Sequence, residues 1–376
     1  MDLPAGTEGT GYAGGRPRGS AGRRVARSHS RFTAAVAMVF VAAFTATNVS
    51  AVRPAPAGPS AIGAARVSGA ASTRVRASGT ARAGAQSAAY GTRSGLPWLS
   101  GAFLASQTPG AASTFAAWRH RRLDLAVLWP NEGTWAAITD PFWLYRRWKR
   151  AHTPMVLSEP MLPTHVPGVS IRACANGAYR AHWRLFGRVI RASGLGSSII
   201  RLGWEFNGAW FPWAATQPRT WAECWRQIVT AARSTAPHLR WDWNVNRGVS
   251  SALANPARAY PGNAYVSMVG IDSYDWWPPA TTAAGWNKQL NGKQGLNYWL
   301  AFAKAHGKKL SVPEWGNARY GASAGGDDPQ YVRDMKAFFA ANARYLAYEA
   351  VCQSPLGAYV YGRFMPRAAA AYRNRF

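Results

Sequence analysis

The chain has 376 residues, a length that corresponds to one or two domains. Its 44 Lys and Arg residues outnumber 16 Asp and Glu residues, and the net charge of +28 attracts polyanions. A codon bias toward Arg would give the same excess without any function. Zinc-finger spacing, Cys-x-x-Cys and a basic stripe on one predicted helix are not found, so neither a structural zinc site nor a nucleic-acid partner is indicated.

The N-terminal part of the chain is typical of an exported protein. Six Arg residues between Arg16 and Arg31 precede an apolar run at 32–46, and small residues at 49–51 offer a cleavage site, so residues 1–51 are predicted to be a signal sequence. The run is short for a membrane span, although an uncleaved anchor is the alternative. We expect a secreted or cell-envelope-associated monomer with no stable membrane span after cleavage.

Residues 52–96 are mostly Ala, Gly, Ser, Arg and Pro and contain no Trp. Such a segment cannot bury enough apolar surface to offset the entropy lost on ordering, so it is predicted to be a disordered linker. The folded domain is then expected at 97–376.

Inside that domain, short apolar segments alternate with longer helical ones. The predicted strands are 99–106, 123–130, 153–160, 197–207, 239–246, 265–275, 308–316 and 344–351. Clear helical patterns cover 177–192, 220–234 and 366–375. This alternation predicts an α/β fold with a parallel sheet, and eight repeats favour a closed (β/α)8 TIM barrel over an open sheet.

Three cysteines allow at most one internal disulfide. Cys174 and Cys224 fall in neighbouring predicted helices with a strand between them, so they are the candidate pair. Cys352 is then expected to be a buried thiol.

The acidic residues of the predicted domain gather where a barrel builds its site. Six of fourteen lie at or near the C-terminal ends of predicted strands: Glu159, Glu205, Asp242, Asp272, Asp275 and Glu314. Helix capping or a surface salt bridge would account for Asp275 and Glu159. It accounts poorly for Glu205 and Glu314, which are embedded in "LGWEFN" and "SVPEWG", where flanking Trp residues desolvate a carboxylate.

Two carboxylates facing one cleft are what cleavage of a glycosidic bond needs. One donates a proton to the leaving oxygen, and the other, kept ionised, attacks the anomeric carbon. Trp faces stack on the apolar faces of sugar rings, so Trp210, Trp243 and Trp315 are expected to contact substrate, whereas Trp221 and Trp225 are expected in the core. The remaining predicted substrate-binding residues are Arg201, Asn207, Asn246, Asp272 and Tyr274, with Arg201 also placed to pair with a carboxylate.

The segment "RLGWEFNGAWFPW", 201–213, resembles the strand-4 signature of family 26 glycoside hydrolases, the β-mannanase-like group of retaining (β/α)8 glycosidases. "SVPEWG" and "GIDSYD" resemble that family's strand-7 and strand-6 segments. The resemblance implies that Glu205 is the acid/base and Glu314 the nucleophile, with Tyr274 hydrogen-bonded to the nucleophile. It also implies that Asp272 and Trp210 line sugar subsites.

The chain departs from the family pattern at two places. Trp204 stands where characterised mannanases of the family have His, and no Trp is evident at the end of the eighth predicted strand. These departures alter the subsite that recognises the sugar and leave the two carboxylates intact.

We therefore predict a secreted retaining O-glycosyl hydrolase, mannanase-like, acting on a polysaccharide, with no cofactor and no metal. The basic charge suggests an anionic polymer. The alternative is a catalytically silent carbohydrate-binding barrel at the cell surface. A metal-dependent hydrolase would need a His-x-His or comparable cluster, which the seven His residues do not show.

Overall fold

The structure is a computed structural model that describes residues 92–354 and 363–376. The predicted signal sequence, 1–51, and the predicted linker up to residue 91 lie outside the described residues. Ser94 and Leu96 are buried, and the Ser94 hydroxyl donates to Asp124 Oδ2 at 2.6 Å. The folded part therefore includes residues just before position 97.

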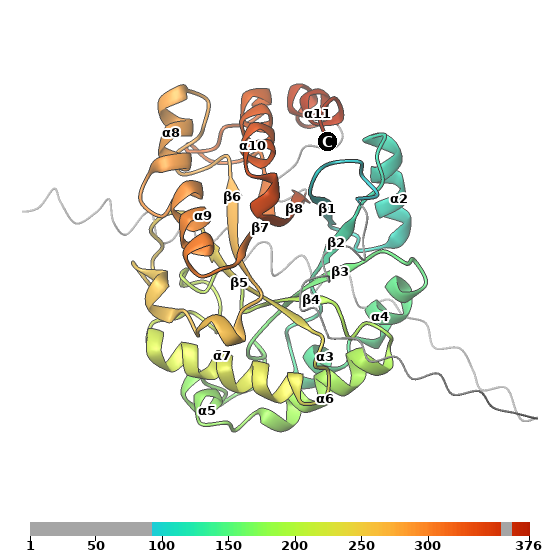
Figure 1. The fold of residues 1–376 in the computed structure, drawn as a ribbon, viewed down its shortest axis with the longest axis vertical. Coiled ribbons are helices and arrows are strands. Elements are labelled where there is room, and N and C mark those ends of the chain that lie inside the picture. The colour runs from blue at the N-terminus through green and yellow to red at the C-terminus, as the bar shows by residue number, and fades with distance from the viewer. Residues whose placement is uncertain (1–91, 355–362) are drawn as a thin grey trace, which may run out of the picture.

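Eight parallel strands close into one barrel in sequence order, with β1 pairing with both β2 and β8. This confirms the predicted (β/α)8 barrel (Figure 1). The strands are β1 (Leu99–Leu104), β2 (Leu125–Leu128), β3 (Met155–Glu159), β4 (Ile199–Leu202), β5 (Arg240–Asn246), β6 (Met268–Tyr274), β7 (Lys309–Gly316) and β8 (Leu346–Gln353).

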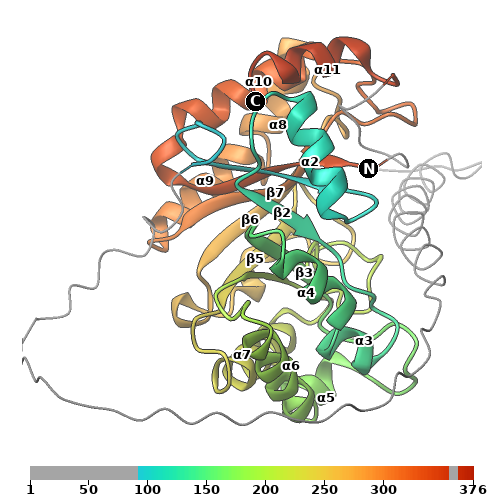
Figure 2. The same ribbon diagram turned by 90° about the vertical axis from the view of Figure 1, so that its right-hand side faces the viewer.

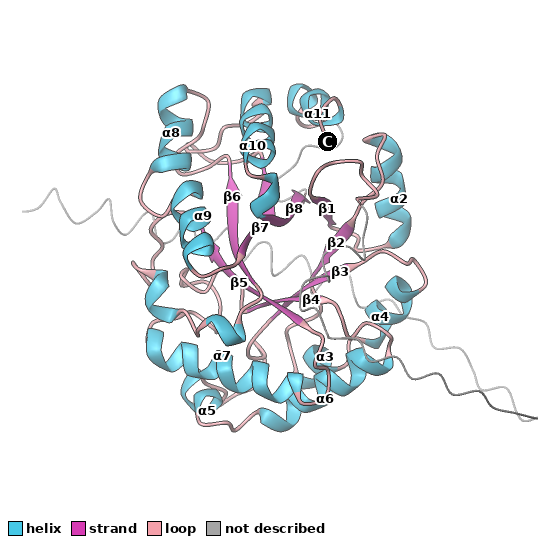
Figure 3. Cartoon of the chain, viewed as in Figure 1, coloured by secondary structure: helices cyan, strands magenta, loops and turns pink. Residues whose placement is uncertain are grey.

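The helices lie outside the strands, as Figure 3 shows by colour. They are α2 (Pro109–Trp118), α3 (Trp135–Thr139), α4 (Phe142–Lys149), α5 (Ile171–Ala175), α6 (Arg180–Ala192), α7 (Pro218–Arg233), α8 (Ala283–Asn291), α9 (Leu296–Ala305), α10 (Pro329–Ala341) and α11 (Pro366–Arg373). Short 3-10 turns cover Pro256–Ala259, Asn263–Tyr265 and Ala343–Tyr345. The predicted helices 177–192, 220–234 and 366–375 correspond to α6, α7 and α11.

The core lies between the strands and the helices and is rich in aromatic residues. Trp221 and Trp225 of α7 are fully buried, as predicted, and the Trp221 ring packs 4.2 Å from that of Phe206. A disulfide joins Cys174 of α5 to Cys224 of α7, which confirms the predicted pair, and Cys352 is a buried free thiol. Within residues 92–354 and 363–376, none of the helices has the length and apolar character that crossing a membrane would require.

Candidate active site

The first carboxylate, Glu205, lies in a turn after β4 and not in a strand. We predicted a strand over 197–207, but β4 ends at Leu202 because Gly203 and Glu205 both adopt positive φ, at 53° and 51°. A Cβ at Gly203 would lie 2.5 Å from Met161 Sδ, so only glycine fits this turn. A non-glycine residue at positive φ is uncommon and often marks a functional site.

Glu205 is half-buried, and its carboxylate accepts a hydrogen bond: Trp210 Nε1 donates to Glu205 Oε2 at 3.0 Å. The Trp210 ring folds over Gly208, where an added Cβ would lie 2.2 Å from the indole. The backbone N–H of Glu205 donates to the carbonyl oxygen of Asn244 at 3.1 Å. The turn is thereby fixed to β5.

The second carboxylate, Glu314, points into the barrel because β7 is irregular. Ser311 and Glu314 both face inward: the Ser311 hydroxyl donates to Asp242, and Glu314 contacts Arg201 and Tyr274. In a regular strand, residues three apart face opposite sides. The register of β7 against β8 shifts between Val312 and Trp315, which restores the inward direction at Glu314.

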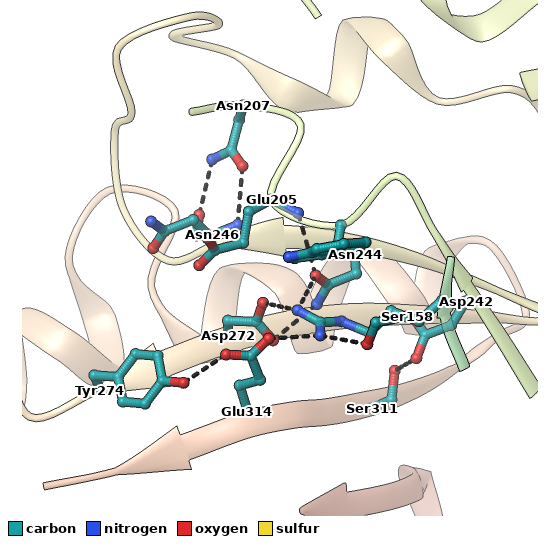
Figure 4. Close-up of polar contacts among 12 residues, drawn as sticks. Ser158, Glu205, Asn207, Asp242, Asn244, Asn246, Asp272, Tyr274, Ser311 and Glu314 are labelled. Atoms are coloured by element: carbon teal, nitrogen blue, oxygen red, sulfur yellow. Dashed lines mark hydrogen bonds and ion pairs between the residues drawn. The ribbon is translucent and has the colours of Figure 1, made fainter. Parts of the chain in front are cut away.

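Glu314 is held by one cation and one phenol. Arg201 Nη1 lies 2.5 Å from Glu314 Oε1, and the Tyr274 hydroxyl donates to Glu314 Oε2 at 2.5 Å (Figure 4). The first contact confirms that Arg201 pairs with a carboxylate. The second agrees with the hydrogen bond that the family resemblance implied for Tyr274.

Asn244 connects Arg201 to Asp272, and the sequence analysis did not single it out. Its Oδ1 accepts from Arg201 Nη2 at 3.0 Å, and its Nδ2 donates to Asp272 Oδ1 at 3.1 Å. Arg201 also forms a buried ion pair with Asp272. The alternation in "RWDWNVN" offered a signal, since Asp242, Asn244 and Asn246 share one face of β5.

The electrostatic environments of the two carboxylates differ. Burial, followed by the nearby charge of Glu314, raises the pKa of Glu205 to about 8, although Arg201 and the Trp210 hydrogen bond favour the ionised form. Glu205 can therefore hold a proton at neutral pH. Glu314 instead contacts the Arg201 guanidinium and accepts a hydrogen bond from Tyr274. A proton donor thus lies near a carboxylate that is held by a cation and a phenol.

Several residues expected to bind substrate lie elsewhere. Trp243 and Trp315 are fully buried and face the helices: Trp243 packs on Trp299 of α9, and Trp315 packs on Phe339 of α10. The expected sugar contacts of both are wrong, because each follows an inward-facing residue in its strand. Trp210 remains partly exposed beside Glu205, and its contact with sugar stays a prediction.

Three polar expectations also change. Asn207 is fully buried: its Nδ2 donates to the carbonyl oxygen of Asn246, and its Oδ1 accepts from the Asn246 N–H. It therefore fastens the turn after β4 to the end of β5 and does not reach substrate. Arg201 and Asp272 are 0% and 1% exposed and form an ion pair with each other. Arg201 also holds Glu314, so both residues are buried beneath the carboxylate and do not line a sugar subsite. Asn246 is partly exposed at the end of β5, and its contact with substrate stays a prediction.

Two further expectations concern Glu159 and a metal site. Glu159 was expected as a helix cap or in a surface salt bridge, but it is fully buried, and neither of its carboxyl oxygens has a hydrogen-bond partner among the described residues. Among the residues that the structure describes, no three His, Cys, Asp or Glu side chains form a group that could hold a metal ion.

Two carboxylates at the C-terminal ends of β4 and β7 of a closed barrel are the arrangement expected of the (β/α)8 class of glycosidases. Residues 197–314, the segment that carries both carboxylates, match the model of glycosyl hydrolase family 26. This segment of the chain is therefore similar to glycosyl hydrolase family 26, in agreement with the resemblance seen in its motifs.

Comparison with known proteins agrees with this class. Endoglucanase H of Acetivibrio thermocellus is 27% identical over 132 residues, which cover 32% of this chain and 14% of that protein. This chain thus matches only a small part of the relative's length.

Solved structures share the fold. A modular endo-β-1,4-mannanase from Cellulomonas fimi superposes with a TM-score of 0.56 at 18% identity, covering 74% of this chain and 69% of that one. GH26C from Muricauda sp. MAR_2010_75 gives a TM-score of 0.53 at 16% identity, with coverages of 74% and 84%. The catalytic domain of a GH26 endo-β-1,4-mannanase from Bacillus sp. JAMB-750 gives 0.52 at 16% identity, with 74% and 86%.

Proposed function

We propose that the protein is a secreted, retaining glycoside hydrolase that cleaves β-glycosidic bonds inside a polysaccharide, with Glu205 as acid/base and Glu314 as nucleophile. The observation that carries the proposal is the contrast between the two carboxyl groups. Glu205 has a pKa of about 8 and holds a proton, whereas Glu314 contacts the Arg201 guanidinium at 2.5 Å.

In the first step, the Glu205 proton moves to the glycosidic oxygen as the bond from that oxygen to the anomeric carbon breaks. A Glu314 oxygen forms a bond to the same carbon, and the leaving chain departs as an alcohol. Tyr274 and Arg201 hold Glu314 in one orientation for this attack. In the second step, the Glu205 carboxylate takes a proton from water, the water oxygen bonds to the anomeric carbon, and Glu314 is released.

The substrate class rests on the relatives. The names of the similar proteins describe an endoglucanase and endo-β-1,4-mannanases, so we infer internal cleavage of a β-linked polysaccharide, mannanase-like. Export rests on the N-terminal pattern of Arg residues, apolar run and small residues at 1–51.

A panel of soluble polysaccharides, including mannan and β-glucan, tests the proposal through released reducing ends and the anomeric configuration of the first product. Wild-type protein is expected to release ends with retained configuration. Glu205→Gln and Glu314→Gln are each expected to lose about 10²-fold or more of the activity. Glu223→Gln, on the outside of α7, is the matched control.

Full activity in Glu314→Gln would refute the nucleophile assignment. Polysaccharide binding by the wild type without any release of reducing ends across the panel would instead favour the silent carbohydrate-binding barrel.

A further inference from the structure

The outer face of α6 carries a stripe of four arginines. Arg180, Arg184, Arg188 and Arg191 are all exposed, and their spacing of four, four and three residues keeps them on one side of the helix. At 1.5 Å per residue the stripe is about 16 Å long. The sequence prediction that no helix carries a basic stripe is therefore wrong for α6.

The neighbouring helices extend this charge. Together α5, α6 and α7 carry eight Arg residues and a single acid, Glu223, and that acid pairs with Arg226. Figures 1 and 2 both show the three helices packed side by side along one edge of the molecule. We call the outer surface of α5, α6 and α7 the basic face.

The basic face is a rigid surface. The Cys174–Cys224 disulfide ties α5 to α7, and Arg180 Nε donates to Gln227 Oε1 at 2.7 Å, which ties α6 to α7. Arg184 and Arg188 follow Arg180 on α6, and within the described residues neither forms an ion pair. Two exposed cations about 6 Å apart along the helix are thus left without a carboxylate partner.

We propose that the basic face binds an acidic polysaccharide, a linear glycan with a carboxylate on its repeating sugars. This inference rests on the proposed function for its choice of a glycan. Charge is the main recognition chemistry on the stripe, because Trp183 and Phe186 of α6 are buried and cannot stack on a ligand. A regularly spaced row of anions is therefore the complementary ligand.

The face lies outside the barrel, whereas Glu205 and Glu314 lie at the strand ends inside it. Binding at the basic face therefore retains the protein on an anionic matrix without filling the cleft. The bound acidic chain and the cleaved chain need not be the same polymer.

The test uses the full chain and polygalacturonate as the probe, with affinity electrophoresis at low salt and at about 0.5 M salt, where exposed charges are screened. The variant Arg184→Glu/Arg188→Glu is compared with Lys288→Glu/Lys293→Glu. The control makes the same change in net charge at exposed residues on and just after α8, on the opposite side of the molecule in Figures 1 and 2.

Wild type and the α8 variant are expected to bind polygalacturonate with similar affinity at low salt, and the α6 variant about tenfold more weakly. An equal loss of affinity in both variants, or no loss in the α6 variant, would overturn the proposal, since either result means that the polymer does not bind at the basic face. Tighter wild-type binding to duplex DNA than to polygalacturonate at equal salt would overturn the choice of ligand.

Two further measurements separate this inference from the hydrolase proposal. Glu314→Gln is expected to bind polygalacturonate as wild type does, and the α6 variant is expected to hydrolyse a short neutral oligosaccharide at the wild-type rate. A wild type that binds polygalacturonate through α6 but cleaves nothing refutes only the hydrolase. A wild type that cleaves but shows no α6-dependent binding refutes only the docking surface.

Discussion

Arg201 on β4 reaches across the barrel to Glu314 on β7, and Arg201 Nη1 lies 2.5 Å from Glu314 Oε1. The same guanidinium binds Asp272 and Asn244, and it lies within 6 Å of the ring centroids of Trp129 and Trp204. One fully buried cation therefore balances two acidic residues in a largely aromatic setting.

Replacing this cation is expected to destabilise the fold. Arg201→Met leaves the buried Asp272 carboxylate without its partner, and breaking such a pair costs about 3–5 kcal/mol of unfolding free energy. Arg201→Lys keeps the charge and is expected to lose less. Urea unfolding followed by Trp fluorescence measures both, and a wild-type midpoint for Arg201→Met would show that the pair is not formed.

The alkaline side of the pH–rate profile is expected to follow Glu205. Its pKa of about 8 means that the proton-donating form prevails below that pH and disappears above it, so kcat/KM falls with increasing pH. Trp210→Phe removes a hydrogen bond that favours the ionised form, so the pKa of Glu205 should rise and the decline should move to higher pH. Tyr298→Phe, on an exposed part of α9, is the control, and a shift to lower pH in Trp210→Phe would contradict the assignment.

Asn244 is expected to act as a positioning residue. It is fully buried and binds Arg201, Asp272 and the Glu205 backbone, so it orients both carboxylates without touching substrate. Asn244→Ala should lower kcat by about 10²-fold with KM nearly unchanged, because small misplacements of catalytic groups are costly. Asn244→Asp adds a carboxylate beside Asp272 and should not rescue it. An increase in KM at unchanged kcat would assign Asn244 to substrate binding instead.

Glu159 is expected to make stability depend on pH. Burial raises its pKa well above the ordinary value near 4.5, and neither carboxyl oxygen has a hydrogen-bond partner in the part of the chain that the structure describes. Because the folded protein holds this proton more tightly than the unfolded chain, its contribution is complete below about pH 4.5 and is lost as pH rises through the raised pKa. Glu159→Gln should therefore lose less stability than wild type between pH 5 and pH 8 in thermal unfolding. An identical pH dependence in both proteins would mean that a group other than Glu159 causes the change in stability.

The sequence was sufficient for the architecture because strands buried on both faces form short apolar runs at regular spacing. It was also sufficient to place Glu205 and Glu314 near the ends of β4 and β7, since acids among Trp residues at strand ends are unusual. It was insufficient for the direction of side chains. Trp243 was expected in the cleft although its neighbours Asp242 and Asn244 point inward, and alternation sends it outward.

Other misses have a different cause. The end of β4 at Leu202 depends on positive φ at Gly203 and Glu205. The apolar pattern of 197–207 does not predict these backbone angles. Asn207 was expected at the substrate because Asn often binds hydroxyl groups. Its amide instead forms hydrogen bonds with the backbone of Asn246, which only the fold brings close to it. Contacts of this kind depend on tertiary geometry.

The register shift in β7 has a consequence for design. An idealised barrel with eight straight strands could keep every residue from Ser311 to Glu314 and still lose the contact between Glu314 and Arg201, because a regular pleat would turn either Ser311 or Glu314 away from the lumen. Anyone grafting this chemistry onto a new scaffold must therefore copy a local defect in the backbone together with the side chains.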